Sequence, residues 1–206
     1  MRFYKVNISI VFLIFCFTMQ HCYAQKPVNE KALHKEVKKL EKEGWETFPG
    51  ALPLEVQITK SWQKQSDADE RGNPVFINSD GIALAKLKSV AEAQAMEFAR
   101  ISIAGMIETK ILSVIEANLS NTKLANDDVT SLNQIVRNSK NTITTKLGYV
   151  DPVVKLYRVN KDGDFEVHVT VFYNLKQTLD VAKNVIGKQV GDKLSGEQLD
   201  KLLTLN

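Results

Sequence analysis

Cysteine is nearly absent from this chain of 206 residues, and its two copies, Cys16 and Cys22, both lie near the N-terminus. The sequence after them therefore has no disulfide, no thiolate nucleophile and no cysteine-based metal site. Proline and glycine are also scarce, at 5 and 10 residues, which excludes a collagen-like or low-complexity chain. A packed core must then stabilise the fold, and the length fits one domain with extensions.

A strong excess of charge of one sign is lacking too. The 27 Lys and Arg residues stand against 24 Asp and Glu, a formal charge of +3. The basic residues alternate with acidic ones, and no basic run is interleaved with aromatic residues. We therefore expect no nucleic-acid partner.

Residues 1–24 have the three-part pattern of a secretory signal peptide. A basic start leads into an apolar run from Ile8 to Phe17, and Cys22 and Ala24 are the small residues before Gln25. The apolar run is about half the roughly 20 residues that span a bilayer. We expect cleavage between Ala24 and Gln25 and export, to the periplasm or outer membrane in a Gram-negative bacterium.

A lipid anchor at Cys22 is the less favoured alternative. Lipoprotein processing needs a small residue directly before the modified cysteine, but Gln20 and His21 precede Cys22. Contact with a membrane is then expected only through the signal before its removal. Cleavage also removes Arg2 and Lys5, so the mature chain is nearly neutral and its partners are not selected by net charge.

Residues 25–74 are predicted to form an N-terminal helix and a Pro/Gly-rich extension. Leu33, Val37 and Leu40 recur at helical spacing within 29–45, in a background of Lys and Glu. This pattern predicts an amphipathic helix with a solvated charged face. His34 lies among these charges and is expected to face water.

The rest of this extension reads as irregular. Leu54, Val56 and Ile58 alternate as in a short strand, and residues 65–73 are polar and predict an exposed loop. Three acidic residues of this loop are Asp67, Asp69 and Glu70. They lack the glycine and terminal glutamate of a calcium loop, so we expect no metal.

Residues 75–190 are predicted to form an α+β domain built on a long helix from Lys86 to Ala117. Its bulky stripe, expected to pack on a sheet, is Leu87, Val90, Ala91, Gln94, Phe98, Ile101, Ile107, Ile111, Leu112 and Ile115. A second row, nearly all small, is Ala91, Ala95, Ala99 and Ile103. That row either admits another backbone closely, as in a helix pair or homo-oligomer, or reflects the helix propensity of alanine alone.

Two β-rich runs, Tyr149–Val159 and Phe165–Tyr173, are joined by a turn signature at 160–163. The predicted core face of the second run is Phe165, Val167, Val169, Val171 and Tyr173, with Glu166, His168, Thr170 and Phe172 on the other face. A two-residue loop would pair Leu156 with Val169, and a three-residue loop with a Gly163 bulge would pair it with His168. The sequence does not choose between them.

Helices are predicted on either side of this hairpin. One follows the cap at Asn126 and continues to Ile143, and another begins near Leu175 and carries an apolar stripe to Val190. A polar extension at 191–206 ends the chain. The predicted fold class is therefore α+β: an antiparallel sheet with a C-terminal hairpin, covered by a long alanine-rich helix, with N- and C-terminal helices.

Few residues offer chemistry. No phosphate-binding glycine loop, nucleophile elbow or metal-spaced His pair is present. His168 beside Glu166 is the one acid–base pair to weigh, and a structural cross-strand bond is the commoner use of such a histidine. Trp45 and Trp62 flank the Pro/Gly-rich segment and either line a ligand groove or anchor a loop on the core.

The element order resembles that of the small bacterial envelope lipoproteins of the LPP-twenty type, a group that includes flagellar outer-membrane lipoproteins. The resemblance covers about residues 75–190: a strand at Gly81, the helix Lys86–Ala117, a second helix, and strands at 153–159 and 165–171. It implies a compact α+β domain and an envelope location. It carries over no catalytic residue, and the lipid-attachment context is missing here.

These observations predict an exported, non-catalytic envelope protein without cofactor, acting through contacts with envelope proteins or by self-association. The alternative is a periplasmic ligand-binding module with a groove near Trp45 and Trp62. An enzyme using His168 and Glu166 is the least favoured.

Overall fold

The computed structural model describes residues 29–118 and 126–190, so the predicted signal at 1–24 with its cleavage site, and the predicted extension at 191–206, lie outside the described residues. The helices are α2 (Glu30–Lys42), α3 (Leu54–Ser66), α4 (Lys88–Asn118), α5 (Asn126–Asn138), α6 (Lys140–Leu147) and α7 (Leu175–Val190). The strands are β1 (Glu46–Thr47), β2 (Phe76–Ala85), β3 (Val154–Val159) and β4 (Phe165–Asn174). The predicted α+β class is confirmed.

The strands form one antiparallel sheet in the order β1-β3-β4-β2. The hairpin of β3 and β4 pairs Leu156 with His168, which selects the second of the two predicted registers. The backbone N–H of Asn160 donates to the carbonyl of Asp164 at 2.9 Å, and Gly163, at φ +80°, donates to the carbonyl of Asn160. The glycine adopts the left-handed conformation that this loop requires.

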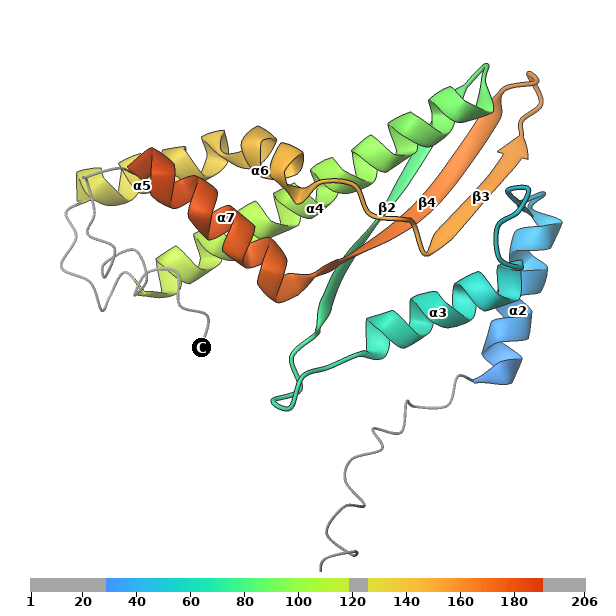
Figure 1. Cartoon of the computed structure of the whole chain (residues 1–206), viewed down its shortest axis with the longest axis horizontal. Helices are drawn as coiled ribbons and strands as arrows, with labels where there is room; N and C mark the ends of the chain where they lie inside the picture. Colours follow the sequence, from blue (N-terminus) through green and yellow to red (C-terminus); the bar gives the residue numbers. More distant parts are fainter. Residues whose placement is uncertain (1–28, 119–125, 191–206) are drawn as a thin grey trace, which may run out of the picture.

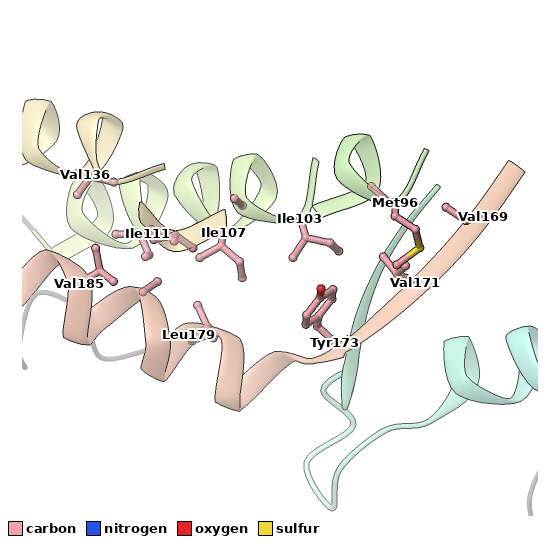
Figure 2. Close-up of a cluster of buried hydrophobic side chains, with 14 of the residues drawn as sticks. Met96, Ile103, Ile107, Ile111, Val136, Val169, Val171, Tyr173, Leu179 and Val185 are labelled. Carbon is pink, nitrogen blue, oxygen red and sulfur yellow. The ribbon is translucent and has the colours of Figure 1, made fainter. Parts of the chain in front are cut away.

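Helix α4 packs both on the sheet and on a layer of helices (Figure 1). Its 31 residues extend about 46 Å, whereas the ten residues of β2 extend about 33 Å, so the helix continues past the end of the sheet. The first half of α4 covers β2 and β4, and the second half packs with α5, α6 and α7. In Figure 2, Met96 lies beside Val171, while Ile107 and Ile111 face Leu179 and Val185 of α7.

The small-residue row of α4 meets the backbone of β2. Ala91, Ala95 and Ala99 are fully buried, and a Cβ built on Gly81 would meet the carbonyl oxygen of Ala95 and lie 2.9 Å from the backbone nitrogen of Ala99. Helix and strand approach so closely because neither carries a large side chain at the contact. The row therefore admits a backbone closely, but that backbone is strand β2 of the same chain and not the helix pair or second copy that was predicted.

The predicted bulky stripe of α4 is only partly core. Ala91, Ile107, Ile111 and Ile115 are buried, but the other stripe residues of the first half are exposed: Leu87, Val90, Gln94, Phe98 and Ile101. The reason is that the buried face changes along the helix: alanines face the sheet in the first half, and isoleucines face the helical layer in the second. The expectation that the bulky stripe packs on the sheet was therefore wrong for the first half of α4.

The strand predicted at Leu54–Ile58 is wrong, because these residues begin α3. Pro53 precedes the helix, where its missing N–H costs no hydrogen bond, and the buried positions Gln57, Ile58 and Ser61 follow helical spacing. Gln57 also bonds to the backbone of β3, where β1 no longer pairs with it. Its side-chain oxygen accepts from the backbone N–H of Lys155 at 2.7 Å, beyond the short strand β1.

The single helix predicted from 126 to 143 is also corrected, because α5 and α6 divide at Ser139. The Ser139 hydroxyl donates to the carbonyl of Ile135 at 2.8 Å. Such a local bond from a side chain to its own helix bends the backbone. Helix α7 matches its predicted span.

The sheet face opposite α4, called here the second face, holds a smaller cluster. Leu33 and Leu40 of α2 and Ile58 of α3 pack with Val154 and Leu156 of β3. On β4 the predicted core face is confirmed, but Thr170 and Phe172 of the second face are buried too. The sheet is therefore covered on both faces, with α4 on one and α2 and α3 on part of the other.

Candidate interaction surface

Trp45 lies three residues after the end of α2 and is buried against the second face. Its ring contacts His168 edge-on, with 5.7 Å between the ring centroids, and the guanidinium carbon of Arg158 lies 4.4 Å from the Trp45 ring centroid. Trp62 of α3 packs half-buried in the same cluster. These contacts lie within the chain, which favours the anchoring role of the tryptophans over the ligand groove.

His168 and Glu166 share the second face but have different partners. Nε2 of His168 lies 3.2 Å from Oδ1 of Asp80, without an aligned hydrogen bond. Glu166 instead accepts from Nε of Arg158 at 2.7 Å. The Thr170 hydroxyl donates to the same Asp80 oxygen at 2.5 Å. The structure does not join the two predicted acid–base residues into one site.

We expect the Asp80→Asn variant to lose less stability in acid than the wild-type protein loses. The contact with His168 lowers the pKa of Asp80 and Thr170 adds to this, while partial burial opposes it. The Asp80 carboxylate therefore stabilises the fold above its unfolded pKa of about 3.9, and this stabilisation is lost as the pH falls through the lower folded pKa. Urea midpoints at neutral pH and in strong acid would measure the difference. Asp162→Asn, in the exposed hairpin turn, is the control, and an equal acid loss in wild type and Asp80→Asn would contradict the expectation.

The remaining chemistry-bearing residues are dispersed. His34 is exposed on α2, and Asp69 accepts bonds from the backbone N–H groups of Arg71 and Asn73 in the predicted loop. Within residues 29–118 and 126–190, no three His, Cys, Asp or Glu side chains gather to hold a metal. None of the helices in these ranges has the length and apolarity to cross a membrane.

The feature that stands out is a group of large apolar side chains left in solvent at β2 and the first half of α4. They are between 39% and 62% exposed: Ile82, Leu84, Leu87, Val90, Phe98 and Ile101. Because Gly81 faces α4, Ile82 and Leu84 project to the second face, whereas the other four residues lie on or next to α4. We call these six residues, which lie on both faces of the sheet, the β2–α4 surface. Single exposed apolar residues are ordinary, but a group of this kind marks a protein contact or an aggregation hazard.

These helix residues lie toward the free edge of the sheet. Glu92 of α4 pairs with Lys155 of β3 at 2.9 Å, and Nζ of Lys88 lies 4.0 Å from the ring centroid of Tyr157, also in β3. At 100° per residue, Val90 and Ile101 lie on the opposite side of the helix from Lys88 and Glu92, and Phe98 lies between that side and the buried alanine row. Because the strand order is β3-β4-β2, that opposite side is the side of the β2 edge.

The β2–α4 surface was not predicted as a site. Its helix residues were assigned to the core stripe, since apolar residues at helical spacing usually face a core. One signal was available in the sequence: α4 carries apolar residues on more than one side, which exceeds what one buried face needs.

No protein-family model, curated protein or solved structure matches this chain.

Proposed function

We propose that this chain is an exported, non-catalytic component of the cell envelope that acts through protein contacts made by its β2–α4 surface. The observation that carries the proposal is the group of exposed apolar side chains on that surface. Six large apolar residues in solvent are costly to solubility unless a partner covers them. Two polar residues of the second face, Glu166 and Thr170, already have partners within the chain.

Export and the envelope location are supported by the sequence. Residues 1–24 have the signal-peptide pattern, and the element order of residues 75–190 resembles the LPP-twenty-type envelope lipoproteins. Cell fractionation, with mass spectrometry of the mature N-terminus, tests both. We expect a periplasmic or outer-membrane-associated protein that begins at Gln25. A full-length chain in the cytoplasm would contradict export, and a lipid on Cys22 would replace cleavage at Ala24.

Photo-crosslinking in living cells tests the contact. A benzophenone amino acid at Phe98 is expected to form a defined covalent adduct with one protein, because that side chain lies in the proposed contact. The same probe at Val159, an exposed apolar residue at the end of β3, is the matched control and is expected to form none. Equal labelling at both positions, or none at either, would count against the β2–α4 surface.

A further inference from the structure

Strand β2 is an edge strand with an open side. All ten of its residues pair with β4 on one side. On the other side, no backbone hydrogen bond joins residues 76–85 to any other described residue. A long edge strand with exposed apolar side chains is a template for pairing with another strand. Here Ile82 and Leu84 supply those side chains, each half exposed.

We propose that β2 pairs antiparallel with β2 of a second copy of this chain, across a two-fold axis at Ala83, so that one sheet runs through both copies. This inference rests on the proposed function, for it names the partner of the β2–α4 surface. A two-fold axis perpendicular to the sheet keeps both α4 helices on the same face. It also makes the interface self-complementary, as symmetric dimers require.

The side chains select the register. With the axis at Ala83, Ile82 lies opposite Leu84 of the second copy, and Asp80 lies opposite Lys86, the residue directly after β2. Apolar side chains then meet apolar ones, and opposite charges face each other, which are the favourable cross-strand pairs. The Lys86 ammonium already pairs with Asp164 at 2.7 Å, and because its side chain is largely exposed it can accept a second carboxylate partner.

Neighbouring registers lose this match. An axis at Asp80 places the Asp80 carboxylates of the two copies opposite each other, and like charges directly opposite are destabilising. An axis at Ile82 places Asp80 opposite Leu84. An axis at Leu84 places Lys86 opposite Ile82. Only the register centred on Ala83 satisfies both the apolar and the charged residues.

The spacing of the helices agrees with this arrangement. Helix α4 lies over both β2 and β4, so its axis is displaced from β2 by about half the strand spacing of about 4.8 Å. Adding the β2–β2 spacing and the same displacement in the second copy places the two α4 helices about 10 Å apart. Packed helices lie about 8–10 Å apart. The exposed residues Val90 and Ile101 lie on the side of α4 that faces this space.

The second half of the same helix shows what covers this side of α4. From Gly105 onward it is packed by the chain itself: Lys140 of α6 approaches Gly105, and Arg137 of α5 reaches Glu108. Gly105 and Glu108 lie on the same side of α4 as Val90 and Phe98. In the proposed dimer, α4 of the second copy covers the first half of this side of α4, as α6 of the same chain covers the second half.

The oligomeric mass tests the dimer. The protein is produced from the full-length gene, purified from the envelope fraction and measured by light scattering across a dilution series. We expect wild type at twice the chain mass, Leu84→Lys at the mass of one chain, and Val159→Lys, the control with an exposed strand residue replaced, at twice the chain mass. Circular dichroism of each variant checks the fold.

Cysteine crosslinking tests the register. In a background with Cys16 and Cys22 replaced by serine, Ile82→Cys and Leu84→Cys are mixed and oxidised mildly. Residues directly opposite in an antiparallel pair have Cα atoms about 4.5–5.5 Å apart, within disulfide range. The mixture is expected to form disulfide-linked dimers, whereas either variant alone, with its cysteines on a diagonal, is expected to remain largely reduced.

The outcomes separate the dimer from the proposed function. A monomeric wild type whose Phe98 probe captures a different envelope protein overturns the dimer and supports the proposed function. A wild-type dimer unaffected by Leu84→Lys overturns this interface. A monomer that forms no adduct at Phe98 overturns both.

Discussion

Replacing Gly81 by alanine is expected to destabilise the protein by about 3 kcal/mol, the upper part of the range for overpacking a tight contact. The new methyl group would overlap the backbone carbonyl of Ala95 and approach the backbone nitrogen of Ala99 at 2.9 Å. Both atoms belong to the helix backbone, so no side chain can rotate away. Relief requires α4 and β2 to separate, which loosens the packing of Ala91 and Ala95 against the strand.

Gly105→Ala is the matched control for this prediction. Its new methyl group would meet only the end of a flexible side chain, Nζ of Lys140 at 3.3 Å. Alanine also favours the helix over glycine, so a gain of about 0.5–1 kcal/mol is expected. Urea denaturation of both variants measures the two changes. If Gly81→Ala were neutral, the close approach of helix and strand would be wrong.

The hairpin and the C-terminal helix were predictable from the sequence because their patterns are local. The alternation from Phe165 to Tyr173 identifies the core face of β4 without knowledge of what covers it. Helix α7 shows a single apolar stripe, and its span matches. The hairpin register needed one more fact, the left-handed conformation of Gly163, which the sequence allows but does not require.

The parts that could not be predicted depend on contacts between distant segments. Leu54, Val56 and Ile58 fit both a strand and the first turns of a helix, and the buried contact of Gln57 with Lys155 belongs to the helix. The partner of the alanine row could not be named either, because nothing local connects Ala95 with Gly81 of the preceding strand. Periodicity identifies a face, whereas the neighbour of that face is a tertiary property.

The same limit applies to the candidate site. Trp45 and His168 were selected for their chemistry, and the structure places them in contact with each other and with Arg158. This cluster holds α2 against the sheet. The surface that carries the proposed function consists of residues whose type alone suggests a core, and only their exposure at the edge of β2 distinguishes them.

Replacing Ile107 by alanine is expected to destabilise the protein by about 2–5 kcal/mol, the usual cost of truncating a buried isoleucine. Ile107 is fully buried where α4 leaves the sheet and packs against the helical layer (Figure 2). Met106, the preceding residue on the helix, is 44% exposed, so Met106→Ala is the control and is expected to cost less than about 1 kcal/mol. Urea denaturation followed by circular dichroism would measure the change in the free energy of unfolding for both variants.

The comparison decides whether the two layers unfold together. If the helical layer and the sheet share one core through α4, Ile107→Ala shifts one cooperative transition without changing its slope. If α5, α6 and α7 form an independent unit, the variant instead shows an early partial transition that leaves the tryptophan fluorescence of Trp45 and Trp62 unchanged. The continuous burial from Ala91 through Ile103 to Ile115 favours the single transition, because no exposed break separates the two halves of the core.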